Sequence, residues 1–218
     1  IKGASSALFG SSALNGVINL RTAYAKDKPN TAVTIFAGGY DAPKYQYKWW
    51  KGSSQQQQGI NFSHAQKIGQ LDLVIGGHMF NDDGYRGGIV TQTLGVGTNT
   101  VTEDVLKTES EKRGRFNMNL RYNFKKIPGL YIGVNTNMMD VQGGLFFLWK
   151  NADSALCPND IQQYKNKRFN IDPFITYFFG EGNKLSFRNR YFITINTNDK
   201  AQESTSELYY NELQYQKQ

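Results

Sequence analysis

Few side chains in this sequence are of the types and spacings that catalyse reactions. The two histidines, His64 and His78, fall in separate predicted strands, and neither has a partner at a metal-ligand spacing. Asp82 and Asp83 are adjacent carboxylates, but they follow an apolar run and precede a glycine, which is typical of a turn. Calcium binding by these two carboxylates is the weaker alternative.

Motifs that hold nucleotides, metals or activated nucleophiles are also missing from the sequence. It contains no GxSxG, HExxH, Walker or CxxC pattern, and its paired glycines do not precede predicted helices. The single cysteine, Cys157, lies in a turn-like LCPND segment and has no second cysteine with which to form a disulfide within the chain. We therefore predict no catalytic residue, no metal site and no cofactor.

The composition predicts a sheet with one wet face and one apolar face. The chain has 218 residues, of which 14% are aromatic, yet its mean hydropathy is −0.56. Such a combination is expected when apolar and polar residues alternate along strands. No apolar run reaches the roughly 18 residues of a transmembrane helix. The net charge of +7 comes from scattered Lys and Arg, which does not predict nucleic-acid binding.

Apolar and polar residues alternate over many short runs. In residues 115–124, one set of alternate positions is apolar and the other is polar: Phe116, Met118, Leu120, Tyr122 and Phe124 against Asn117, Asn119, Arg121 and Asn123. Only a strand places these two sets on opposite faces. Similar runs occur at 71–79, 131–139 and 185–196, and less regular ones at 31–40, 59–65, 169–179 and 207–216. The pattern predicts about eight strands, each near the roughly 9–11 residues that cross a bilayer as a tilted strand.

The predicted connections between these strands alternate in length. Short turns with glycine fall at 65–70, 123–130 and 180–183, whereas long polar stretches fall near 40–58, 83–112 and 142–167. Short turns at one end and long loops at the other are typical of an outer-membrane β-barrel. A soluble β-sandwich, in which the apolar face would be the core, is the alternative.

Two groups of side chains are candidates for contact with a ligand. Aromatic residues of the long loops would suit stacking on a glycan or a hydrophobic chelate, or would form an interfacial belt: Tyr47, Trp49, Trp50, Phe147 and Trp149. Arginines in the middle of the polar strand faces require those faces to be wet: Arg121, Arg188 and Arg190.

The stretch IKGASSALFGSSALNGVINLRT at the start of the sequence resembles the C-terminal part of the plug domain of TonB-dependent outer-membrane receptors. In that family a strand ending in Lys-Gly is followed by two small-residue helical turns, each closed by glycine, and by a Val-Ile-Asn strand. The residues that carry the resemblance are Lys2, Gly3, Ser6, Phe9, Gly10, Asn15, Gly16 and Asn19. Glycine suits the ends of short helices because it adopts positive φ. The amino-acid sequence of this stretch is most similar to that of receptors from Bacteroidetes.

The resemblance implies both the architecture and the function. Residues 1–22 would end the plug, 23–30 would link it to the barrel, and 31–218 would form the first part of an all-β transmembrane antiparallel barrel of about 22 strands. We therefore expect a piece of a larger Gram-negative outer-membrane transporter, surrounded by outer-membrane lipid. Its partners would be the TonB energy-coupling complex and a small-molecule or oligosaccharide ligand, with ferric siderophores the commonest cargo and glycans next. A passive porin or adhesin barrel is the alternative membrane function.

Overall fold

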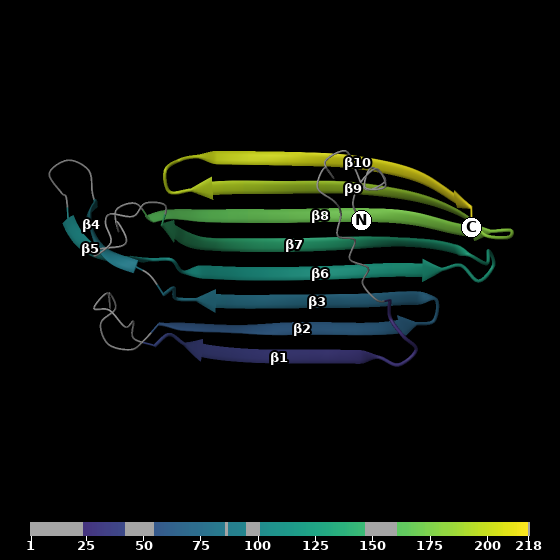
Figure 1. Ribbon diagram of the computed structural model, residues 1–218, viewed down its shortest axis with the longest axis horizontal. Helices are drawn as coiled ribbons and strands as arrows, with labels where there is room; N and C mark the ends of the chain where they lie inside the picture. Colours follow the sequence, from purple (N-terminus) through teal and green to yellow (C-terminus); the bar gives the residue numbers. More distant parts are fainter. Residues whose placement is uncertain (1–23, 42–54, 86, 95–100, 147–160, 218) are drawn as a thin grey trace.

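The computed structural model describes residues 24–41, 55–85, 87–94, 101–146 and 161–217. Every regular element in these ranges is a β-strand (Figure 1). The strands are β1 Asn30–Gly39, β2 Gln56–Ile68, β3 Leu71–Asp82, β4 Gly87–Leu94, β5 Val101–Thr108, β6 Glu111–Asn123, β7 Leu130–Phe146, β8 Ile161–Phe179, β9 Asn183–Asn198 and β10 Glu203–Lys217. The described ranges hold no helix with the length and apolarity needed to span a membrane.

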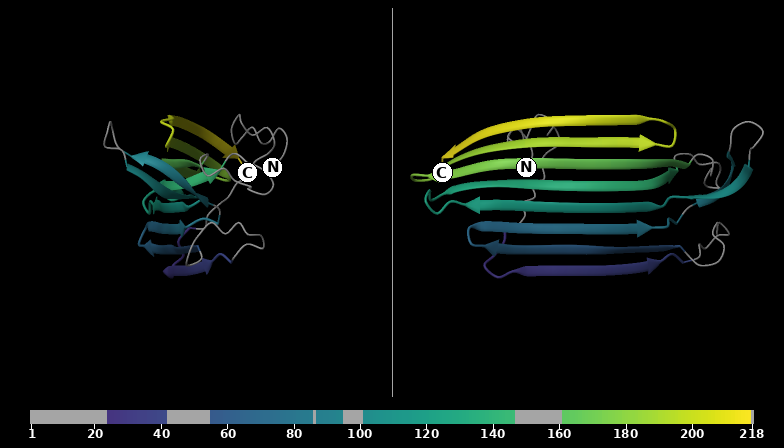
Figure 2. Two further views of the ribbon diagram at one scale, coloured as in Figure 1. Left: turned by 90° about the vertical axis from the view of Figure 1, so that its left-hand side faces the viewer. Right: turned by 180° about the vertical axis from the view of Figure 1, so that it is seen from behind.

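Eight of the strands form one antiparallel sheet in the order β1-β2-β3-β6-β7-β8-β9-β10. Strands β4 and β5 form a separate hairpin that lies beyond the ends of β3 and β6 (Figure 1). Figure 2 shows that the eight strands lie side by side in a single layer. The prediction of an all-β antiparallel fold is therefore confirmed, and the eight strands of the sheet correspond to the eight alternating runs of the sequence.

The register of the sheet keeps the two sets of alternating residues on opposite faces. Leu120 of β6 lies opposite Leu73 of β3 and Val134 of β7, so apolar residues continue from strand to strand. One residue along, Arg121 lies opposite Asp72. Because side chains alternate across a strand, this register separates an apolar face from a polar face. We call the face of Leu73, Leu120 and Ile193 the apolar face and the face of Asp72, Arg121 and Arg190 the polar face.

The apolar face is not covered by any other described element. Val141 and Ile161 are the only hydrophobic residues that are buried within the described ranges. On the apolar face, large side chains of each of the eight strands of the sheet are exposed, and examples are Val33, Ile35, Phe62, Met79, Phe116, Met138, Ile175, Phe187 and Leu213. Leu213 is 71% exposed and Met79 is 68% exposed. The described part of the chain thus places its apolar side chains on a surface rather than in a core.

The connections differ between the two ends of the sheet (Figure 1). At one end, short turns join β2 to β3, β6 to β7 and β8 to β9, as the sequence predicts. At the other end, the β4–β5 hairpin occupies most of the connection from β3 to β6, and β7 and β8 extend into the stretch 142–167 that we expected to be a loop. The last connection at this end, between β9 and β10, is a turn after Asn198 rather than a long loop. We call the first end the short-turn end and the second the long-connection end.

Candidate functional site

The polar face is the candidate functional surface, because it collects most of the hydrogen-bonded and charged side chains of the sheet. Three of the predicted ligand contacts, Arg121, Arg188 and Arg190, lie on it. The others, Tyr47, Trp49, Trp50, Phe147 and Trp149, lie outside the described residues, as do the plug-like residues Lys2, Gly3, Ser6, Phe9, Gly10, Asn15, Gly16 and Asn19. The site is therefore built from the sheet alone.

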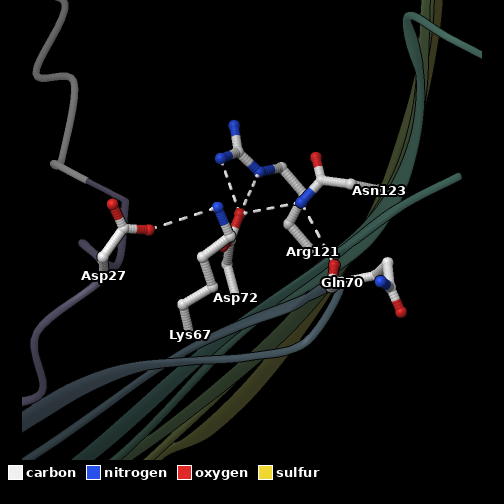
Figure 3. Close-up of polar contacts among 6 residues, drawn as sticks. All are labelled: Asp27, Lys67, Gln70, Asp72, Arg121 and Asn123. Atoms are coloured by element: carbon white, nitrogen blue, oxygen red, sulfur yellow. Dashed lines mark hydrogen bonds and ion pairs between the residues drawn. The ribbon is translucent and has the colours of Figure 1, made fainter. Parts of the chain in front are cut away.

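Arg121 is held by a carboxylate near the short-turn end (Figure 3). Its guanidinium Nη2 lies 2.6 Å from Oδ2 of Asp72, and its Nε donates to the same oxygen at 2.8 Å. Asn123 donates to Asp72 at 3.2 Å and to the carbonyl of Gln70 at 3.1 Å. The side chain of Asp72 is only 3% exposed, so this carboxylate depends on Arg121 for its charge compensation.

The segment that precedes β1 also contacts the Arg121 region. The Tyr24 ring lies under the guanidinium of Arg121, 3.3 Å from ring centroid to Cζ. Asp27 and Lys67 form an ion pair of 3.5 Å in the same region (Figure 3), although Asp27 is almost fully exposed. The ion pair is therefore weak, whereas the cation–π stack covers one side of the guanidinium. Tyr24 thus brings this segment onto the polar face near the short-turn end.

Arg190 is likewise engaged by a carboxylate within the sheet. Its Nε and Nη2 donate to the two oxygens of Asp172 on β8 at 2.9 and 2.7 Å, which is a bidentate arrangement. Asn170 donates to Asp172 at 3.0 Å. Because both oxygens of Asp172 are occupied, Arg190 is positioned to stabilise the sheet rather than to capture a second anion.

Arg188 differs from the other two predicted arginines. It is exposed and lies between Phe174 of β8 and Glu212 of β10. Glu212 accepts a hydrogen bond from Tyr210 at 3.2 Å. Among the described residues, Arg188 forms no ion pair, so of the three predicted arginines it is the one without a carboxylate partner.

Two further exposed arginines lie on one transverse row of the polar face, and sequence analysis did not single them out. The register places His78, Arg115, Met139, Arg168 and Thr194 opposite one another on successive strands. Arg115 donates only to the sulfur of Met139, at 3.4 Å, and Arg168 makes no ion pair with the described residues. The signal that would have found this pair is the register, because Arg115 begins one alternating run and Arg168 directly precedes another.

A shallow hollow with a volume of about 440 Å³ lies on the polar face near the long-connection end of β7 to β10. Most of its lining residues are neutral and polar, among them Tyr164, Asn166, Asn196, Asn198 and Ser204, and the charged ones are Lys165, Arg168 and Glu203. Asn166 donates to Asn196, which in turn donates to Ser204 at 3.1 Å. The carboxamide oxygen of Asn166 is buried and accepts no hydrogen bond from the described residues. The hollow thus offers both donors and acceptors to a polar molecule.

A tyrosine and two aspartates join β1, β2 and β3 at the long-connection end. Tyr40 donates to Asp82 at 2.8 Å, and the other oxygen of Asp82 accepts from the backbone N–H of Gly84 at 2.8 Å. Asp83 accepts from the backbone N–H of Gln56 at 3.1 Å. Burial, together with the hydrogen bond and charge of Asp82, raises the pKa of Tyr40 to about 12. These contacts confirm that the two aspartates serve the turn.

The histidines do not form a metal site within the described residues. His64 lies on the apolar face with a hydrogen bond to Thr31 at 2.7 Å, and His78 lies on the polar face with one to Asn61 at 2.7 Å. The described part of the chain contains no group of three metal-ligating side chains. Its polar face presents arginines, carboxamides and hydroxyls, which bind ligands through hydrogen bonds and charge.

No family model, curated protein or solved structure matches this chain. The function is therefore argued from the two faces of the sheet and from the residues on them.

Proposed function

We propose that this chain belongs to a TonB-dependent outer-membrane transporter and that its eight-stranded sheet is part of the wall of a transmembrane β-barrel. The observation that carries the proposal is the exposed apolar face, which extends over all eight strands opposite a face with ion pairs and carboxamides. In a membrane barrel the first face contacts lipid and the second lines a water-filled lumen. Strands of the sheet with 10 to 19 residues are long enough to cross a bilayer when tilted.

The position of the segment before β1 supports the presence of a plug on the polar side. Residues 23–30 resemble the link between plug and barrel, and Tyr24 stacks on Arg121 on the polar face. A chain that comes from a plug must reach the barrel from the lumen. The contact of Tyr24 with Arg121 lies on the face of the sheet that would line the lumen, as a plug requires. The resemblance of residues 1–22 to the family motif is what favours an active transporter over a passive porin or adhesin.

In the proposed mechanism a ligand that is too bulky or too scarce for porins binds at the long-connection end. The TonB complex of the inner membrane then acts on the plug, and the ligand passes along the polar face into the periplasm. Ferric siderophores or similar chelates are the first ligand class to test, and glycans are the second. The chain itself supplies binding and a passage, whereas the energy comes from the inner-membrane proton gradient.

Neighbouring residues of β8 allow a direct test of the orientation of the sheet. Ile175 lies on the apolar face and is 42% exposed, and Thr176 lies on the polar face. In the full-length protein with Cys157→Ser, a spin label at Ile175→Cys should be relaxed by oxygen dissolved in lipid. A label at Thr176→Cys should instead be relaxed by a water-soluble nickel chelate. Equal access of the nickel chelate to both positions in lipid vesicles would contradict a membrane-spanning sheet.

Transport is tested separately in cells of the native host. Uptake of radiolabelled iron as a siderophore chelate, or of a labelled oligosaccharide, should fall when either this gene or TonB is deleted. A passive porin predicts loss with the gene deletion but not with the TonB deletion. Uptake of every tested class that is unchanged in both strains, from a protein that does span the membrane, would reject the transport function while leaving the orientation intact.

A further inference from the structure

We infer that Arg115 and Arg168 form an anion-binding pair for a compact ligand that carries two or more carboxylate or phosphate groups. The inference rests on the proposed function, because it treats the polar face as the lumen, and it goes further by naming a substrate chemistry and the two residues that recognise it.

Arginines of the polar face fall into two groups. Arg113, Arg121 and Arg190 have carboxylate partners in the sheet, namely Glu111, Asp72 and Asp172. Arg115, Arg168 and Arg188 have none among the described residues, and all three are exposed. Arg115 and Arg168 share one transverse row, and Arg188 lies six residues along β9 from that row. A guanidinium remains charged at any physiological pH. Two neighbouring arginines without carboxylate partners therefore create a positive potential on this face.

The geometry brings the two guanidinium groups within reach of one ligand. Arg115 and Arg168 are the two register neighbours of Met139, on either side of β7. Two strand spacings separate their backbones by about 10 Å, and each side chain is long enough to cover part of that distance. Both guanidiniums can therefore contact one molecule, each with the fork that matches a carboxylate or a phosphate.

The surroundings of the pair contain no competing carboxylate. One step along each strand from the row, the polar-face residues are Gly76, Phe80, Arg113, Asn117, Asn137, Val141, Asn166, Asn170, Phe192 and Asn196. The nearest acids beyond them are Glu111 and Asp172, which are paired with arginines, and Asp82, which accepts hydrogen bonds from Tyr40 and the backbone N–H of Gly84. An anion that binds here therefore meets carboxamide donors and no acidic side chain within one step of the row.

Arg168 also lines the hollow near the long-connection end, which indicates the rest of the ligand. A molecule held by its acidic groups at Arg115 and Arg168 would place a neutral polar part against Asn166 and Asn196. Hydroxyl groups suit these side chains because a carboxamide both donates and accepts hydrogen bonds. The site thus fits a hydroxylated polyanion, whether free or as a metal chelate.

The test uses the full-length protein in detergent, with citrate and inorganic pyrophosphate as probes in isothermal titration calorimetry at low salt. We expect Arg115→Gln/Arg168→Gln to bind citrate roughly tenfold more weakly or worse, with a smaller dependence of affinity on salt. The matched control is Lys112→Gln/Lys167→Gln, which removes the same charge from the apolar face of the same two strands. The control should bind as the unmodified protein does. Arg115→Lys/Arg168→Lys should be intermediate, because it keeps the charge but loses the forks.

Each outcome of this experiment has a defined meaning. Binding of both probes that is lost only in the arginine variant supports the pair, and binding of pyrophosphate alone narrows the class to phosphates. Equal loss in the lysine control shows a general charge effect and overturns the inference. Absence of binding by the unmodified protein also overturns it. Because the spin-label experiment on Ile175 and Thr176 reports orientation independently, a failed anion site is distinguishable from a failed membrane assignment.

Discussion

Asp72 and Arg121 lie opposite each other on β3 and β6 and are joined by an ion pair of 2.6 Å that leaves the carboxylate 3% exposed. The pair fixes the register of two strands that are separated in sequence by the whole β4–β5 hairpin. A slip by one residue would place Arg121 on the apolar face and remove the partner of Asp72. The pair therefore helps to specify which side of the sheet is polar.

Removal of Arg121 should destabilise the sheet because it leaves a buried carboxylate uncompensated. We expect Arg121→Ala to lower the free energy of unfolding by about 3 kcal/mol, the lower end of the range for buried pairs, since Arg121 itself is partly exposed. The measurement is urea unfolding of the protein refolded in lipid vesicles. The double variant Asp72→Asn/Arg121→Ala should recover part of the loss. If the double variant is as unstable as the single one, the charge of Asp72 is not the cause.

A new charge should destabilise the protein more on the apolar face than on the polar face. Leu120 lies on the apolar face between Leu73 and Val134, whereas Asn119 is its neighbour on the polar face. If the apolar face meets lipid, Leu120→Arg should cost about 2–4 kcal/mol near the bilayer midplane. The control Asn119→Arg should cost much less. Vesicle unfolding titrations that give equal costs for the two variants would contradict the proposed orientation.

Gly84 should be irreplaceable at the start of the connection from β3 to β6. It adopts a φ of +85°, and a Cβ at this position would lie 2.6 Å from the backbone of Glu109. We expect Gly84→Ala to cost about 1–3 kcal/mol through backbone strain alone, with the clash adding to it. Gly114→Ala on β6 is the matched control, because a Cβ there meets nothing within 4 Å. Comparable unfolding midpoints for the two variants would show that the turn relaxes.

Tyr40 should ionise at a higher pH than an ordinary tyrosine. Because its pKa is raised to about 12 in the folded protein, the folded state holds the phenol proton more tightly than the unfolded state does. The resulting stabilisation is fully present below about pH 10 and is lost as the pH rises from about 10 to 12. The difference in tyrosinate absorbance between the unmodified protein and Tyr40→Phe should have its midpoint near the raised value.

Asp82→Asn distinguishes the causes of this shift. Burial is the largest cause and the hydrogen bond and charge of Asp82 follow, so the variant should lower the midpoint for Tyr40 only in part. Asparagine keeps an oxygen that can accept from Gly84, which preserves the turn. A midpoint that does not move would show that Asp82 has no electrostatic effect on Tyr40.

Strand identity was predictable from sequence because side-chain alternation is a local property. Residues such as Met118 and Leu120 alternate with asparagines over a run that no helix would sort in this way. Strand ends were less predictable. β7 and β8 extend into a stretch rich in polar residues, because backbone pairing with a neighbour continues where the apolar alternation has ended. The β4–β5 hairpin was missed because its sequence mixes Thr, Gln and charged residues with apolar ones and shows no clear alternation.

The roles of the arginines were not predictable from sequence, because they depend on long-range register. The sequence predicts Arg121 and Arg190 as ligand contacts, whereas the sheet places Asp72 of β3 and Asp172 of β8 beside them. Arg115 and Arg168 belong to strands separated by β7, and only the order of the sheet puts them on one row. Local alternation identifies the polar face of the run that begins at Arg115, but neither the position of Arg168 beside it nor which arginines have no carboxylate partner.

The turn between β9 and β10 has a consequence for access to the sheet. Its residues Asn198 and Gln202 also border the hollow, so the hollow lies beside the tightest connection at its end of the described sheet. The shortest connection at the long-connection end therefore borders the hollow on the polar face. In the proposed transporter a ligand would reach the hollow past this short turn. An antibody or phage bound to the turn would block the same route.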